Sequence, residues 1–92
     1  MRHKDNFLLQ NVGGENLLVP LGAQVMDLNA IITLNSTSAF LWALLDQDRS
    51  LDELVAAVVE RFAVEQPRAH ADIQIFLAEI TNLGLLQMST AV

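Results

Sequence analysis

Few side chains in this sequence could carry out chemistry, and they are scattered along it. His3 and His70 are the only histidines, and neither has a second histidine or a carboxylate at the spacing of a metal site. We therefore expect both rings to be solvated on the surface. Because the chain has no cysteine, disulfides, thiolate metal ligation and thiol catalysis are excluded.

The serines, glycines and aspartates also lack a catalytic or ligand-binding context. No serine lies in a Gly-x-Ser-x-Gly motif, and Ser36 and Ser50 are placed to cap helices. Gly13-Gly14 precedes no helix and so predicts a turn, not a phosphate-binding loop. Asp46 and Asp48 are spaced like the first ligands of a calcium loop, but the glycine and glutamate of that loop are missing. The sequence therefore predicts a protein that is not an enzyme and needs no metal or cofactor.

Composition narrows the range of partners. The formal net charge is −6, with five basic residues scattered among eleven acidic ones, which argues against nucleic acid because phosphates would be repelled. No apolar run approaches the roughly 20 residues of a membrane span, and the N-terminal apolar run is too short for a signal peptide. We expect a cytoplasmic protein. Apolar residues make up 52% of the chain, more than so small a core can enclose, so part of them should face a partner.

The N-terminal third of the chain predicts a three-stranded antiparallel sheet. Two short apolar runs, 7–12 and 16–19, flank Gly13-Gly14 and predict a hairpin whose second strand ends at Pro20. A third strand is expected over about 27–34, with side chains alternating between two faces. Such a sheet leaves two open edges.

Three helices are expected to follow the sheet. The first begins after the polar residues 35–37, contains Trp42 as a core anchor and is apolar on nearly all sides. The second begins at Leu51, because Ser50 and Glu53 form a capping-box pattern. The third spans about 67–83 and ends at Gly84. We expect one α+β domain over residues 1–92, with a core at about 7–86 and a frayed tail from residue 87.

Three stretches of the sequence resemble conserved blocks of the PqqD-like family. Residues 34–46, LNSTSAFLWALLD, are similar to its Leu-Asn-x-x-x-Ala-x-x-Ile/Leu-Trp-x-Leu-Leu-Asp/Glu block. Residues 50–55, SLDELV, and 71–86, ADIQIFLAEITNLGLL, are similar to its second and third blocks in order and spacing. The family comprises small peptide chaperones that also define the recognition element of ribosomally made, post-translationally modified peptides.

This resemblance implies a winged-helix-like fold, in which three antiparallel strands precede three helices, the same order that the periodicity predicts. It also implies that the protein is a non-catalytic adaptor. In the family a precursor leader peptide docks as an extra strand on the third strand, in a groove beside the third helix. The complex presents the precursor to a modifying enzyme, a radical S-adenosylmethionine protein in the pyrroloquinoline quinone (PQQ) pathway. Mapped onto this chain, the pairing strand is Ala30, Ile31, Ile32, Thr33 and Leu34, and the candidate groove wall is Ile73, Phe76, Leu77 and Ile80. Which of these four face the groove and which the core is left open, as are the pathway and the precursor.

Two alternative functions are compatible with this order of elements. A winged-helix DNA-binding regulator would need a basic or amide-rich third helix, whereas this one carries Asp72 and Glu79 and has Arg68 and His70 only at its start. A structural module that dimerises through its open sheet edge or its apolar helix face is also compatible with the sequence, and a homodimer could coexist with peptide binding.

Overall fold

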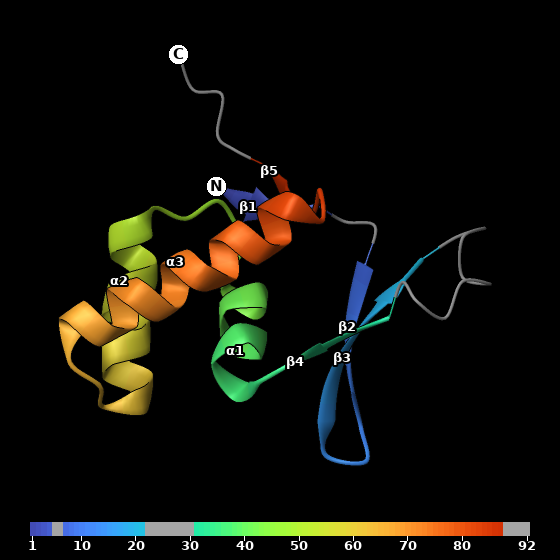
Figure 1. Ribbon diagram of the computed structural model, residues 1–92, viewed down its shortest axis with the longest axis horizontal. Coiled ribbons are helices and arrows are strands. Elements are labelled where there is room, and N and C mark those ends of the chain that lie inside the picture. Colours follow the sequence, from blue (N-terminus) through green and yellow to red (C-terminus); the bar gives the residue numbers. More distant parts are fainter. Residues whose placement is uncertain (5–6, 22–30, 88–92) are drawn as a thin grey trace.

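The computed structural model describes residues 1–4, 7–21 and 31–87, and in these ranges it has the expected α+β architecture. A three-stranded antiparallel sheet lies beside three helices (Figure 1). The elements in chain order are β1 (Arg2–His3), β2 (Phe7–Val12), β3 (Glu15–Pro20), β4 (Ile32–Leu34), α1 (Ser36–Leu44), α2 (Leu51–Phe62), α3 (Gln66–Asn82) and β5 (Leu86–Gln87).

Two glycines make the hairpin between β2 and β3. Gly13 has φ +59° and Gly14 has φ +85°, the left-handed values that a two-residue type I′ turn requires and that other residues adopt only with strain. The turn fixes the register, which pairs Val12 with Glu15 and runs to Phe7 opposite Pro20. The expected hairpin is therefore confirmed, and β3 ends at Pro20 as expected.

The third strand of the sheet, β4, is shorter than the predicted strand over 27–34. It pairs antiparallel with β3 and spans Ile32–Leu34. Ile31 is described but lies outside the strand, and Ala30 and the residues before it in the predicted strand lie outside the described residues. Side chains alternate as expected, with Leu34 buried toward the helices and Thr33 exposed on the other face.

Polar caps start the first two helices. The Asn35 side chain accepts a hydrogen bond from the backbone N–H of Ser38 at 2.8 Å, so Asn35 caps α1 and Ser36, which the sequence suggested as a cap, is the first helical residue. In α2 the Ser50 hydroxyl accepts from the Glu53 N–H at 3.2 Å, and the Glu53 carboxylate accepts from the Ser50 N–H at 3.0 Å. Hydrogen bonds from Ser50 to the Glu53 carboxylate, chiefly the one from the Ser50 backbone N–H and next the one from its side chain, hold the pKa of Glu53 below its ordinary value.

Replacing Ser50 with alanine should destabilise the domain by about 1 kcal/mol, because one N-terminal N–H of α2 loses its partner. The matched control Ser36→Ala removes an exposed hydroxyl one residue after a cap and should change stability little. Urea unfolding followed by circular dichroism measures both. In the wild type, the ionised Glu53 carboxylate also stabilises the folded state. This stabilisation is fully present above the ordinary carboxyl pKa of about 4.3, and it is lost as the pH falls through the lower pKa that Glu53 has in the folded protein. Equal stability of the two variants would contradict the capping role of Ser50.

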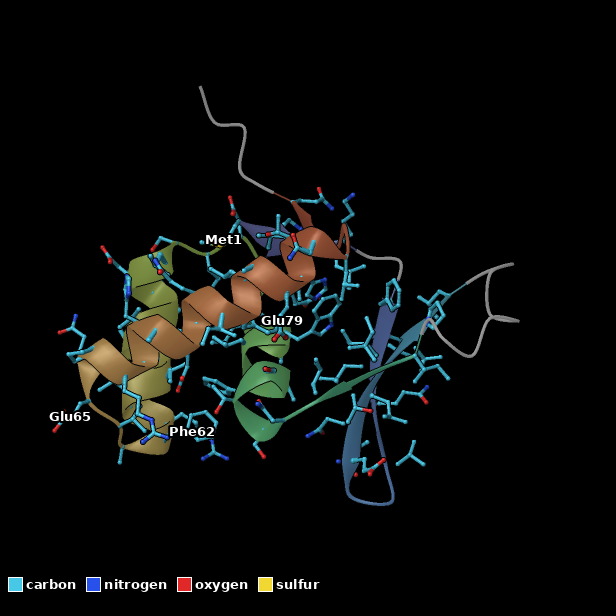
Figure 2. All side chains as sticks on the ribbon, in the orientation of Figure 1. Met1, Phe62, Glu65 and Glu79 are labelled. Atoms are coloured by element: carbon cyan, nitrogen blue, oxygen red, sulfur yellow. The ribbon has the colours of Figure 1, made fainter. Side chains whose placement is uncertain are left out.

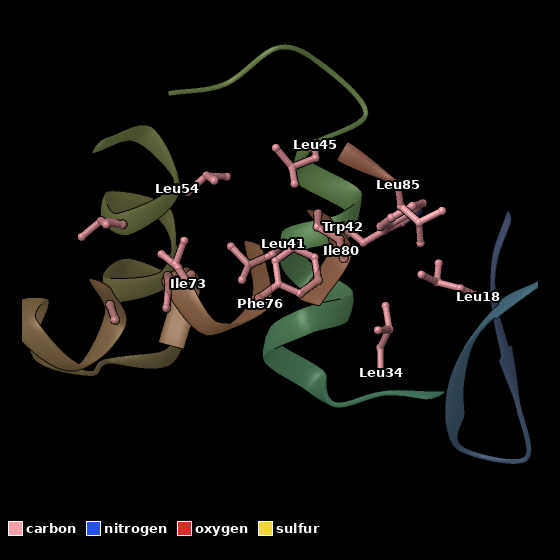
Figure 3. Packing of buried hydrophobic residues seen from close by; sticks show 13 residues of the cluster. Leu18, Leu34, Leu41, Trp42, Leu45, Leu54, Ile73, Phe76, Ile80 and Leu85 are labelled. Carbon is pink, nitrogen blue, oxygen red and sulfur yellow. The ribbon is translucent and has the colours of Figure 1, made fainter. Parts of the chain in front are cut away.

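The hydrophobic core joins the sheet to all three helices (Figure 3). Trp42 and Leu41 of α1 lie at its centre, and Trp42 is only 3% exposed, which confirms the expected core anchor. On one side they meet Leu18 and Leu34 from the sheet, and on the other α2 and α3 pack against them. The remaining buried members are Leu45, Leu54, Val55, Val58, Ala69, Ile73, Phe76, Ile80 and Leu85.

A small second sheet joins the two ends of the described chain. Arg2 pairs with Gln87 and His3 with Leu86 (Figure 1). Gln87, where the sequence predicted that a frayed tail begins, is therefore the last residue of a strand.

The expectation that His3 is solvated is wrong. Its ring is buried and stacks on Trp42, with ring centroids 4.1 Å apart and planes within 3°, and its Nδ1 lies 2.9 Å from the Lys4 carbonyl oxygen. His70 is exposed, as expected.

In the described part of the chain, none of the helices has the length and apolar character needed to cross a bilayer.

Candidate functional site

The sheet order β2-β3-β4 leaves β2 and β4 as edge strands within the described residues. An edge strand presents unpaired backbone N–H and C=O groups to any extended chain. The backbone geometry of the sheet determines which groups these are.

The type I′ turn sets the hydrogen-bonding pattern of the whole sheet. A two-residue turn makes its flanking residues, Val12 and Glu15, a hydrogen-bonded pair. Hydrogen-bonded and non-hydrogen-bonded pairs alternate along an antiparallel ladder, so Leu17 directs its N–H and C=O toward β2 and its neighbours Asn16 and Leu18 direct theirs toward β4.

The partners of Asn16 and Leu18 on β4 are Leu34 and Ile32. Both therefore direct their backbone groups toward β3, whereas Thr33, between them, directs its N–H and C=O toward the open edge. By the same alternation the backbone groups of Ile31 face that edge if the extended chain continues. The backbone that an added strand would use is thus that of Thr33 and Ile31, two of the predicted pairing residues.

A hollow of about 400 Å³ begins where β4 ends. The start of α1 forms one wall and one face of α3 forms the other; the lining residues are Asn35, Thr37, Ser38, Arg68, Asp72, Ile75, Phe76 and Glu79. We name this hollow, with these residues, the α1–α3 hollow. Asn35 lines the hollow and directly follows Leu34, the last residue of β4. A strand that paired with β4 and continued past Leu34 would therefore pass over the α1–α3 hollow.

The predicted groove wall on α3 divides between core and surface. Ile73, Phe76 and Ile80 are at most 2% exposed and belong to the hydrophobic core, and Leu77 is half-buried against the same core. Of these four, Phe76 alone also lines the α1–α3 hollow.

The exposed residues of α3 that line the hollow were missed by the sequence reasoning. Ile75 is 60% exposed, and Glu79 follows it one helical turn later on the same face. The signal in the sequence was Ile75 itself, an isoleucine outside the stripe Ile73, Phe76 and Ile80. Sequence alone did not show that this face borders the end of β4.

The charged groups of the hollow are mostly acidic. Arg68 lies near Asp72, with Nε 3.9 Å from a carboxylate oxygen and both side chains largely exposed, so their mutual attraction is weak. Glu79 has no ion-pair partner among the described residues. In Figure 2 the Glu79 side chain lies between the ribbons of α3 and α1. This exposed face of α3 would repel the phosphates of DNA.

A second hollow of about 400 Å³ lies beside the other edge strand. It is lined by His3 and Trp42, by Phe7, Leu8 and Leu9 of β2, and by Leu21, Ala43 and Asp46. No group of three or more metal-ligating side chains comes together within the described ranges, here or elsewhere. One hollow therefore lies beside β2 and the other begins just past the end of β4, and of these two only the latter is lined by residues of α3.

Comparisons with known proteins agree with this architecture. A solved structure, TbiB1 in complex with the TbiA(beta) leader peptide, is similar in fold, with a TM-score of 0.73 and 20% sequence identity over 97% of this chain and 99% of that one. The search of curated proteins gives no match. The family model described as coenzyme PQQ synthesis protein D (PqqD) matches residues 18–86. Since that match covers most of the sequence and includes β4 and all three helices, the chain belongs to the PqqD family.

Proposed function

We propose that this protein is a non-catalytic adaptor that binds the leader of a ribosomally made precursor peptide by strand addition to β4. The observation that carries the proposal is the outward-facing backbone of Thr33 on an edge strand next to the α1–α3 hollow. The backbone supplies affinity for an extended peptide, and the hollow supplies contacts with alternate side chains.

Family membership and the fold support this proposal. Family resemblance implies peptide binding at the third strand of the sheet and the third helix, which are β4 and α3 here. TbiB1, which shares the fold, is described in complex with a leader peptide. We further propose that the bound precursor is presented to a modifying enzyme of the radical S-adenosylmethionine type, as in PQQ biosynthesis, in the cytoplasm.

The groove wall that we propose differs from the one suggested by the sequence. Ile75 and Glu79, with Phe76 beneath them, form the part of α3 that a leader strand would contact past Leu34. Leu83, which is 54% exposed, lies one turn after Glu79 and would continue this wall. Ile73 and Ile80 act through the core, by fixing the position of α3.

Replacing Ile75 with asparagine should weaken binding of a leader peptide encoded beside the gene by roughly tenfold, because an apolar contact is lost and a polar amide is buried against the peptide. The side chain is exposed in the free protein, so the fold should be retained. Fluorescence anisotropy with a labelled leader peptide measures the affinity.

The matched control is Val12→Asn. Val12 is 55% exposed at the end of β2, beside the turn and distant in the sheet from β4, and its substitution likewise exchanges an apolar side chain for an amide. It should leave the affinity unchanged. Equal losses in the two variants would show that the affinity does not depend on the α1–α3 hollow.

A further inference from the structure

The charge of the α1–α3 hollow indicates what kind of leader it accepts, and this step rests on the proposed function. Glu79 is an exposed carboxylate without an ion-pair partner among the described residues, and it lies beside the apolar side chains of Ile75 and Phe76. Asp72 is at the same wall and is only weakly compensated by Arg68. A leader side chain over this wall therefore meets an apolar surface next to a net negative charge.

We infer that the protein selects leaders that carry a lysine or arginine at the position that passes over the α1–α3 hollow, with an apolar residue at an even spacing from it along the strand. The long aliphatic stem of either cation can lie along Ile75 while its charged end reaches Glu79. An acidic residue at that position would face the carboxylates of Glu79 and Asp72 and would be rejected.

Strand geometry restricts the position of this cation. In a strand added to β4, the residues opposite Ile32 and Leu34 point to the helix side of the sheet, and the residue opposite Thr33 points away. Only every second residue of the leader therefore reaches the hollow. The cation should occur at a fixed even spacing from the apolar residue that packs opposite Leu34.

The whole-protein charge of −6 favours any cationic peptide, so the experiment must separate this general attraction from a specific contact. A random 12-residue peptide library is displayed and selected on the immobilised wild-type protein. The same selection is made on Glu79→Lys and on the control Glu60→Lys. Glu60 is exposed on α2 and does not line the hollow, but its substitution changes the net charge equally.

We expect wild type and Glu60→Lys to enrich the same peptides, which have alternating apolar residues and a lysine or arginine at one fixed position. Glu79→Lys should enrich aspartate or glutamate at that position. For one selected peptide, the affinity for Glu79→Lys should fall by roughly three- to tenfold, and a lysine-to-glutamate change in that peptide should restore it. Absence of a charge preference in wild type, or the same preference in all three proteins, would overturn the inference.

A fourth selection on Thr33→Pro separates this inference from the proposed function. If Thr33→Pro enriches nothing while Glu79→Lys keeps the wild-type preference, strand addition stands and the charge rule is wrong. If Thr33→Pro enriches the same peptides as wild type, peptides bind elsewhere and both are wrong. Failure of the wild type to enrich any peptide also contradicts both.

Discussion

Replacing Thr33 with proline is expected to lower leader affinity by at least roughly tenfold while the domain stays folded. Proline has no N–H, and its ring would occupy the space where an added strand pairs with β4. The N–H that is lost faces the open edge, so no bond to β3 is broken. An unmatched backbone group in a peptide interface costs about 1–3 kcal/mol, which corresponds to the expected loss. Calorimetric titration with a leader peptide measures the affinity, and circular dichroism checks the fold.

Two further variants make this result specific to the backbone. Thr33→Val keeps the N–H and should bind like wild type, which would exclude a role of the hydroxyl. Ile32→Pro removes an N–H that faces β3 and should instead lower the stability of the sheet. Full leader affinity in a folded Thr33→Pro variant would show that the leader does not pair with β4.

Replacing Trp42 with alanine is expected to destabilise the protein by about 3–5 kcal/mol. Trp42 is buried between the sheet and the helices and stacks on His3, so the substitution leaves a large cavity and removes an aromatic contact. Such a truncation costs about 3–5 kcal/mol, a large part of the roughly 5–15 kcal/mol that stabilises a typical domain. Urea unfolding followed by circular dichroism should show a transition midpoint far below that of the wild type.

The control for this prediction is Trp42→Phe, which keeps an aromatic ring and part of the volume. It should be destabilised by less than the alanine variant and should remain folded. Its affinity for a leader should be retained, because Trp42 does not line the α1–α3 hollow. A Trp42→Ala variant within about 1 kcal/mol of wild type would contradict the central position of Trp42 in the core.

Local sequence signals predicted most of the fold. A two-residue hairpin turn requires left-handed backbone, which Gly13-Gly14 can adopt without strain, and the structure has that turn. Ser50 and Glu53 predicted the start of α2 to the residue, and Gly84 lies just past the end of α3 with φ +73°. These signals act over a few residues, so neighbouring sequence is sufficient to identify them.

The parts that sequence did not predict depend on contacts between distant residues. His3 is buried because β1 pairs with β5 and places its ring on Trp42, and neither strand is long enough to show a periodic pattern. The third helix has one apolar stripe in the sequence, but only the packing shows that Ile73 and Ile80 belong to the core and that Ile75 borders the α1–α3 hollow. The outward direction of the Thr33 backbone follows from the register across three strands.

Amide hydrogen exchange measured by NMR tests strand addition most directly. Within the sheet, the N–H of Ile32 and Leu34 already face β3, whereas that of Thr33 faces the open edge. Saturation with a leader peptide should therefore slow exchange at Thr33 by roughly tenfold or more, with smaller changes at Ile32 and Leu34. On the opposite edge, Leu9 and Asn11 of β2 should exchange as before. Unchanged exchange at Thr33 in the complex, or protection at Leu9 and Asn11 instead, would contradict leader binding at β4.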